Sequence, residues 1–386
     1  MPTKKNAAAK SAPSKRAKAA GPKAGPLTLS QAQAIAGVQT EPARLAASAR
    51  RTAVPRALPS AAARAPAAFT SGTSPTPVAQ ERRRLKINEK EELKQRKREY
   101  KATMALLQSR GVKGLPEAAP ARPAGRGVSG MPAAAVRTGP LRIFAEGDSW
   151  FDYPVPFFGG GLVPRLESRL GVPILNLAKA GDETRFMLGV EQRQLIAQHL
   201  REGCPDGTPW ELMLFSGGGN DIVAQPLALW LNDFVAGASI GKMLNQDRYD
   251  SALALVRAAY EDLIKIRNLI SPETTLAFHA YDFAIPDGRG ICHMGPWLKP
   301  AFDVHGFPGD LVSSTAVVRE MLKQFRTMLK DLAKSSNVLF IDAQGTLAPV
   351  PASWHNEMHP SKGGFNQIAD KFSSDIKTLF PGRVVP

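Results

Sequence analysis

The sequence predicts an α/β domain built on a parallel sheet, and two observations point to it. Short apolar segments of strand length recur beyond about residue 138, and amphipathic helical segments separate them. Helices between successive strands provide the crossover connections that parallel strands need, and they cover both faces of the sheet. The first part of the 386-residue chain has neither pattern, so the folded domain is expected at residues 138–386.

Five short apolar segments are expected to be the strands of this sheet. They are residues 141–145, 173–177, 211–215, 275–278 and 338–341. Apolar residues at helical spacing predict helices around 253–264 and 318–332, and a further helix is expected at about 363–379. In parallel sheets of this kind, functional residues gather at the carboxyl ends of the strands.

Residues 1–137 have a different composition. They hold 27 Lys and Arg against 7 Asp and Glu, a net charge of +20, whereas residues 138–386 have a net charge of −4. Residues 1–80 are rich in Ala, Pro, Lys and Arg, so they are expected to form a disordered basic arm. Residues 81–109 predict a charged helix with a thin apolar stripe, either solvated or docked by a narrow edge. Residues 110–137 predict a Pro/Gly/Ala linker.

The basic clusters of the arm suit binding to a polyanion such as nucleic acid or an anionic surface. A solubilising tail is the alternative. Aromatic residues are almost absent there, which argues against stacking on single-stranded bases. No apolar segment marks a signal peptide or a transmembrane helix, so a cytoplasmic location is expected. Cys204 and Cys292 lack metal-binding spacing and are expected to be reduced thiols.

Four polar motifs stand where a parallel sheet would bring them together. Three follow the first three predicted strands: Gly147-Asp148-Ser149, Gly181, and a triple glycine that leads into Asn220. The fourth ends at His359, just before the last predicted helix. Each motif has a plainer interpretation, as a helix cap, a turn glycine or a loop. Together they supply a serine nucleophile, oxyanion donors and a histidine base, which are the parts of an acyl-transfer site.

These motifs resemble the four blocks of the SGNH/GDSL hydrolase superfamily, over residues from about 140 to 386. The resemblance implies a flavodoxin-like three-layer α/β/α sandwich. It also implies that Ser149 is the nucleophile and His359 the base. The backbone N–H groups of Ser149 and Gly181 and the side chain of Asn220 would form the oxyanion hole. No metal or other cofactor is implied.

Two positions depart from the family pattern. Trp150 stands where the family usually has leucine, which suggests a packing change. Asn356 stands where the acid of the catalytic triad is expected, three residues before His359. An asparagine can orient an imidazole by accepting its N–H, but it brings no charge to stabilise the imidazolium. Either the site works with an amide in this position, or an acid comes from elsewhere, with Glu357 the neighbouring candidate.

A long Gly- and Pro-rich loop over residues 282–310 follows the fourth predicted strand. Loops at this edge of a sheet often shape a substrate pocket, so Arg289 and Trp297 are candidates for contacts with an acyl group or a sugar. A loop packed on itself is the equally simple alternative.

The sequence therefore predicts an esterase or acylhydrolase acting on a small-molecule, lipid or sugar ester. The alternative is a polyanion-binding protein whose domain is a catalytically weak scaffold, because the basic arm and Asn356 both fit that interpretation.

Overall fold

The computed structural model describes residues 77–109, 139–153, 160–205, 207–223, 226–291 and 295–384, with the side chains of the first helix described from residue 83 onward. The chain divides into two compact units, residues 1–88 and 89–386. Of the first unit, only the helical residues 77–88 are described. The predicted arm at 1–80 lies largely outside the described residues, and the predicted linker at 110–137 lies wholly outside them.

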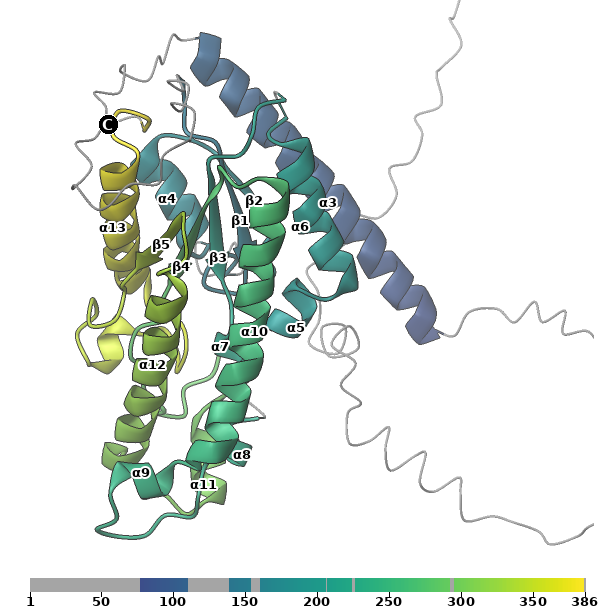
Figure 1. Cartoon of the computed structure of the whole chain (residues 1–386). Coiled ribbons are helices and arrows are strands. Elements are labelled where there is room, and N and C mark those ends of the chain that lie inside the picture. The colour runs from purple at the N-terminus through teal and green to yellow at the C-terminus, as the bar shows by residue number, and fades with distance from the viewer. Residues whose placement is uncertain are drawn as a thin grey trace, which may run out of the picture. The chain divides into compact units, whose positions relative to one another are not determined.

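Five parallel strands form one sheet in the order β2-β1-β3-β4-β5 (Figure 1). They are β1 (Ile143–Gly147), β2 (Ile174–Asn176), β3 (Leu212–Ser216), β4 (Thr275–His279) and β5 (Val338–Ile341). The prediction of an α/β domain with a parallel sheet is confirmed. Each strand lies within two residues of its expected bounds.

Helices alternate with these strands along the chain. The longer ones are α3 (Pro77–Ser109), α4 (Leu162–Leu170), α6 (Val190–Glu202), α10 (Gln246–Ile270), α12 (Val312–Leu332) and α13 (Lys362–Leu379). The short ones are α5 (Thr184–Met187), α7 (Gly219–Ile222), α8 (Leu227–Trp230), α9 (Ile240–Met243), α11 (Lys299–Val304) and the 3-10 turn η1 (Pro351–Ser353).

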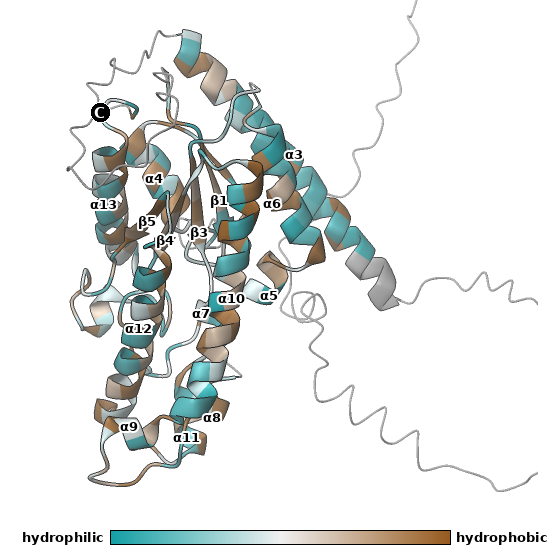
Figure 2. Cartoon of the chain, viewed as in Figure 1, coloured by the Kyte–Doolittle hydropathy of each residue, from teal (hydrophilic) through white to brown (hydrophobic). Residues whose placement is uncertain are grey.

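The central strands of the sheet are buried on both faces, which explains why they are largely apolar. Every residue of β1, β3 and β4 is buried, and Figure 2 shows the strands as hydrophobic. Helix α4 packs against α13, while α10 packs against both α6 and α12. Because all strands are parallel, their carboxyl ends meet at one edge, where Gly147 of β1 pairs with Ser216 of β3.

Two helices are much longer than the strands they cover. Helix α10 has 25 residues and α12 has 21, against five or fewer in each strand. Figure 1 shows both helices continuing past the carboxyl edge of the sheet, where α8, α9 and α11 lie at their far ends. The extended ends of α10 and α12 therefore form a wall beside the region into which the strand-end motifs open.

Helix α3 is mostly hydrophilic (Figure 2), yet its later turns pack on the sheet domain. Tyr100 and Met104 are buried in the hydrophobic core, and the Tyr100 ring lies 5.5 Å from that of Trp210. Arg96 forms an ion pair with Asp152 at 3.3 Å. Of the two interpretations that the sequence left open for this helix, residues 89–109 match the docked one.

Candidate active site

Ser149 lies in the tight turn that leaves the carboxyl end of β1, and it is 8% exposed. The turn is compact because Gly147 has no side chain. A Cβ at Gly147 would lie 2.7 Å from the carbonyl oxygen of Ser216 on the neighbouring strand. The glycine therefore allows β1 to turn while it remains close to β3, and the next residues emerge at the edge of the sheet.

The side chain of Asp148 holds this turn from inside. Its carboxylate accepts hydrogen bonds from the backbone N–H of Trp150 (3.0 Å) and from the hydroxyl of Ser216 (2.9 Å). The hydroxyl of Tyr281 also donates to it. Burial raises the pKa of Asp148 to about 6, although these donors oppose that shift. The side chain of Asp148 thus stabilises the turn that carries Ser149. It does not serve as the acid that orients the His359 imidazole.

His359 reaches Ser149 from the segment before α13. The Ser149 Oγ lies 2.7 Å from His359 Nε2, and His359 Nδ1 lies 2.9 Å from Asn356 Oδ1. An amide oxygen can only accept a hydrogen bond, so Nδ1 carries the imidazole proton and Nε2 is the acceptor. The Ser149 hydroxyl then donates to Nε2, as a nucleophile does toward its general base. The structure brings all three predicted catalytic side chains together.

Asn356 is fully buried, and its surroundings settle which way its amide points. Its Oδ1 also accepts from the backbone N–H groups of Met358 (3.0 Å) and His359 (2.9 Å). Its Nδ2 donates to the hydroxyl of Tyr153 at 3.1 Å. Three donors converge on the oxygen and one acceptor faces the nitrogen, so the oxygen is directed to the imidazole.

Glu357 does not supply the missing acid. Its carboxylate accepts four backbone N–H groups: Gly288 (2.9 Å), Trp297 (2.5 Å), Leu298 (2.7 Å) and Lys299 (2.9 Å). These bonds fasten both ends of the 288–299 segment to the histidine segment, and they cap the start of α11. A carboxylate with these four partners is turned away from His359.

The histidine is strongly biased toward its neutral form. Burial lowers the pKa of His359 to about 3, and the nearby His355 acts in the same direction. Asn356 contributes no charge that would oppose the loss of solvation. The imidazole is therefore neutral near pH 7 and able to accept a proton, but no carboxylate hydrogen-bonds its Nδ1.

The three glycines before Asn220 are explained by close packing. Gly218 has a φ of 93° and precedes the first residue of α7. A Cβ at Gly218 would lie 2.7 Å from the Val256 side chain, and one at Gly219 would lie 3.0 Å from the Tyr281 ring. The chain can pass between these side chains only without side chains of its own. It then places Asn220 in the first turn of α7, facing the same cavity as Ser149.

Gly181 lies in an exposed turn after β2, with a φ of 87°, and it is outside the cavity lining. The turn is nevertheless tied to the one after β3. Asn220 Nδ2 donates to the carbonyl oxygen of Asp182 at 2.9 Å, and the hydroxyl of Thr184 donates to Asp221 at 2.6 Å. The two predicted oxyanion segments are thus neighbours. The role of the Gly181 N–H stays a prediction.

A cavity opens beside these residues. It is lined by Asp148, Ser149, Trp150, Gly219, Asn220, Ile222, Val223, Leu227, Tyr281, Asp282, Ala284, Leu298, Val318, Met321, Leu322, Met358 and His359. Neither Arg289 nor Trp297 is among them. Arg289 pairs with Asp287 at 2.7 Å, while the Trp297 ring meets the His359 ring edge-on with centroids 5.9 Å apart. Their predicted role in substrate contact stays a prediction.

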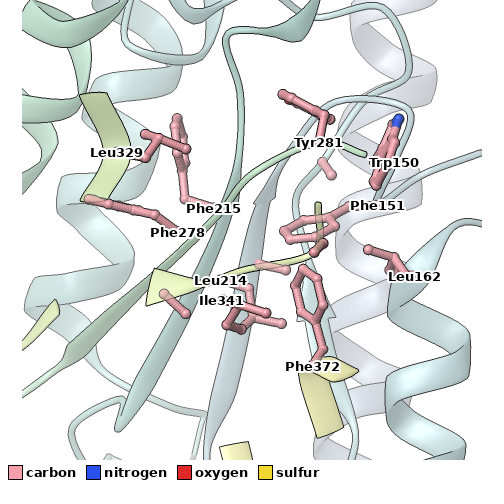
Figure 3. Close-up of a cluster of buried hydrophobic side chains, with 14 of the residues drawn as sticks. Trp150, Phe151, Leu162, Leu214, Phe215, Phe278, Tyr281, Leu329, Ile341 and Phe372 are labelled. Carbon is pink, nitrogen blue, oxygen red and sulfur yellow. The ribbon is translucent and has the colours of Figure 1, made fainter. Parts of the chain in front are cut away.

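Two aromatic residues hold the site together: Trp150, which the sequence marked only as a packing change, and Tyr153, which it did not single out. The indole N–H of Trp150 donates to the carbonyl oxygen of Met358 at 3.1 Å, and its ring packs edge-on against Tyr281 at 5.0 Å (Figure 3). The Tyr153 ring stacks on the His359 ring with centroids 4.3 Å apart. Both follow the serine closely in sequence, but their partners lie far along the chain.

Comparison with known proteins agrees with this geometry. The sequence pattern of the GDSL-like Lipase/Acylhydrolase family matches residues 145–366. The chain belongs to this family, and it is a carboxylic ester hydrolase of the SGNH/GDSL type. A search of curated proteins found no match.

Several solved structures are similar to the chain. The lipase Lip_vut3 from a goat rumen metagenome is 17% identical, over 61% of this chain and 97% of that one, with a TM-score of 0.40. An extracellular lipase from Streptomyces rimosus is 13% identical, over 62% of this chain and 99% of that one, with a TM-score of 0.40. Est24, a carbohydrate acetylesterase from Sinorhizobium meliloti, is 14% identical, over 62% of this chain and 100% of that one, with a TM-score of 0.39.

Proposed function

We propose that this chain hydrolyses carboxylic esters through a Ser149–His359–Asn356 triad in which an amide replaces the usual acid. The observation that carries the proposal is the buried 2.7 Å hydrogen bond between Ser149 Oγ and His359 Nε2. The matching 2.9 Å contact from His359 Nδ1 to Asn356 Oδ1 supports it, since this contact fixes the tautomer that a general base needs.

The chemistry follows from these positions. His359 Nε2 takes the hydroxyl proton as Ser149 Oγ attacks the carbonyl carbon of the ester. The negative charge on the tetrahedral intermediate is then stabilised by the N–H groups of Ser149 and Gly181 and by the Asn220 amide. That amide has two N–H groups, and its bond to Asp182 uses one of them. His359 next protonates the departing alcohol, and a water molecule releases the acyl group by the same steps.

Loss of the nucleophile tests this proposal directly. Ser149→Ala should abolish hydrolysis of p-nitrophenyl acetate and labelling by a fluorophosphonate probe, without a change in melting temperature. Asn220→Ala should lower kcat by about 10²–10³-fold, as the loss of one oxyanion donor does elsewhere. Ser251→Ala removes an exposed hydroxyl on α10 and should have no effect. Full activity in Ser149→Ala would end the serine-esterase proposal.

The finer fold assignment is part of this proposal. A sheet order of 2-1-3-4-5 is that of flavodoxin-like folds, and burial of both sheet faces suits a three-layer α/β/α sandwich. Among the described residues, no helix is both long and apolar enough to cross a bilayer. A cytoplasmic location stays a prediction.

We also propose that the basic arm attaches the protein to a polyanion. The support is the net charge of +20 on residues 1–137 against −4 on the rest. Deletion of residues 1–76 should lower the salt concentration that elutes the protein from heparin, because each cation that binds a phosphate or sulfate releases counterions. Ester hydrolysis should be unchanged. Equal elution of the two forms would contradict the attachment role, and a polyanion-binding scaffold would show retention without turnover.

A further inference from the structure

The cavity beside Ser149 has a chemical character that the family assignment does not specify. Apart from the catalytic residues, its wall is largely aliphatic: Ile222, Val223, Leu227, Leu298, Val318, Met321 and Leu322. Most of these side chains are less than 7% exposed, and Val318, Met321 and Leu322 belong to α12. Among the described residues that line it there is no lysine or arginine.

The two carboxylates in the wall are already engaged. Asp148 is bonded to Ser216 and Tyr281, as described above. Asp282 accepts the backbone N–H groups of Phe283, Gly345 and Leu347, each at 2.7 Å. They offer little to a polar substrate, and their negative charge would repel an anionic one.

We infer that this cavity is the acyl site of the proposed esterase, and that it accepts short, uncharged aliphatic acyl chains. The inference rests on the proposed serine-esterase function. The cavity volume is about 50 Å³. A water molecule needs about 10–15 Å³ of such volume, so the cavity holds roughly three to five groups of methylene size. With the carbonyl carbon added, acyl chains from butyryl to hexanoyl match that space.

Two pairs of residues in α12 allow a controlled test. Met321 lines the cavity and Met328 does not, although both are buried in the same helix. Val318 and Val317 form a second such pair. Met321→Ala and Met328→Ala remove the same atoms from the core, so both lower stability, but only the first enlarges the proposed acyl site.

The measurement is kcat/KM for p-nitrophenyl esters from acetate to decanoate. In the parent, rates should rise to an optimum within the four- to six-carbon esters and then fall. Met321→Ala should move the optimum to longer chains and raise the decanoate-to-butyrate ratio at least about tenfold, since one methylene in an apolar pocket is worth about 10–200-fold. Val318→Phe should move it to acetate. Met328→Ala and Val317→Ala should keep the parent profile.

A charged acyl chain provides an independent measurement. The p-nitrophenyl monoester of glutaric acid should react at least about tenfold more slowly than the valerate ester of equal length. If the parent hydrolyses esters but Met321→Ala and Met328→Ala give the same chain-length profile, the acyl-site assignment is wrong. If the parent hydrolyses no ester and Ser149 resists the fluorophosphonate, the proposed function itself fails.

A second inference comes from a different observation, the surroundings of Tyr153. Its hydroxyl accepts the Asn356 Nδ2–H at 3.1 Å, and it lies 2.9 Å from His355 Nδ1. Because the hydroxyl already accepts from Asn356, its own proton is available to His355. The bonds then run in one direction, from Ser149 through His359, Asn356 and Tyr153 to His355.

The geometry points to Tyr153 as the positioning residue that makes an asparagine workable in this triad. A carboxylate presents an oxygen to the imidazole whichever way it turns, but an amide presents either an oxygen or an N–H donor. A flipped Asn356 would place its NH2 group against the His359 Nδ1–H. The backbone N–H groups of Met358 and His359 favour the correct orientation from the oxygen side. The Tyr153 hydroxyl adds to them because it gives the amide nitrogen its acceptor.

A double-mutant cycle tests this role. Tyr153→Phe keeps the ring stacked on His359 but removes the acceptor, so kcat for an acetate ester should fall about tenfold or more while KM changes less than about twofold. In the Asn356→Asp background the same substitution should cost less than about twofold, since a carboxylate has no orientation to lose. Tyr249→Phe, which removes another buried hydroxyl, should leave kcat for the acetate ester unchanged.

Unchanged kcat in Tyr153→Phe would overturn the positioning role. An equal loss in both backgrounds would also overturn it, because the hydroxyl would then act independently of the amide. Thermal melting of all four proteins separates these outcomes from a general loss of structure.

Discussion

At the scale of single residues, the unusual feature is Asn356 in the place of a triad acid. It keeps the geometric task of that acid, since its oxygen holds His359 Nδ1 at 2.9 Å. It gives up the electrostatic task, because an amide cannot balance the charge of an imidazolium. Orientation and charge stabilisation are usually combined in one carboxylate, and in this site only orientation remains.

Asn356→Asp should restore the charge. The pKa of His359, which burial lowers to about 3, should rise because a carboxylate favours the protonated ring. The imidazolium formed as Ser149 attacks is then more stable, so kcat should increase about tenfold or more. The acidic limb of the kcat/KM profile should move to higher pH, since His359 must be neutral to act as the base. A profile and rate identical to the parent's would show that Asn356 does not control the imidazole.

Sequence reasoning went far at this scale, because the order of the motifs at the strand ends and the family resemblance together predicted Ser149, Asn356 and His359 for one site. It could not decide between Asn356 and Glu357. That decision depends on the backbone N–H groups around residues 288 and 297–299, which a spacing pattern does not contain. Tyr153 was missed for a related reason, since its partners lie about 200 residues away.

At the scale of elements, helix α3 has a larger role in the fold than its charged composition suggests. Its residues lie outside the matched family region at 145–366, but two of them contact segments next to the site. Arg96 donates to the carbonyl oxygen of Asn176 at 2.9 Å and pairs with Asp152, the neighbour of Tyr153. Glu89 pairs with Lys179, two residues before Gly181. The helix therefore braces the segments that follow β1 and β2.

Substitutions within α3 should reveal this docking. Met104→Ala should lower the free energy of unfolding by about 2–4 kcal/mol, because it leaves a cavity in the core. Leu106→Ala, at a position that is 48% exposed in the same helix, should change it by less than about 0.5 kcal/mol. Urea denaturation followed by circular dichroism provides both values. Equally small effects would show that the helix is solvated.

The thin apolar stripe of α3 was visible in the sequence. The bounds of the strands and main helices were predicted closely, because the periodicity of apolar residues is a local property of the chain. The docking of α3 was left open, because Tyr100 contacts Trp210 across more than 100 residues. A boundary drawn at residue 138 from composition alone would cut these contacts.

At the scale of the whole molecule, buried ionisable groups act on stability in opposite directions. Burial raises the pKa of Glu146 to about 8 and those of Asp148 and Asp182 to about 6. It lowers the pKa of His199 and His279 to about 4 and that of His359 to about 3. The native state thus holds protons on carboxyls where the unfolded chain would release them, and it leaves histidines neutral where the unfolded chain would protonate them.

The sign of each contribution follows from these shifts. Below about pH 6.5 the histidines make stability fall with acidification, while the carboxyls oppose that fall. Above pH 6.5 the histidines are neutral in both states, and the unfolded state is favoured as Glu146 loses its proton. Stability should therefore decline between about pH 6.5 and 8.

Glu146→Gln should remove that decline, because an amide stays neutral. Its oxygen can accept from the Gly147 N–H, and its NH2 group can donate to Gln192 once that side chain turns its own oxygen inward. The gain at pH 8 should be on the order of 2–4 kcal/mol, since one unit of pKa corresponds to about 1.4 kcal/mol. Denaturation midpoints measured from pH 5 to 9 would show it, with Glu202→Gln, at an exposed site on α6, as the control. A parallel decline in both variants would exclude Glu146 as its source.

The four backbone N–H groups that donate to the Glu357 carboxylate limit how this active site can move. The residues at 297–299, the cavity wall at Leu298 and the segment that carries His359 are fastened through one carboxylate, so they shift as a unit or not at all. If this segment swung aside to admit substrate, it would take the general base with it and separate it from Ser149. A gate at this position would thus disable the enzyme each time it opened.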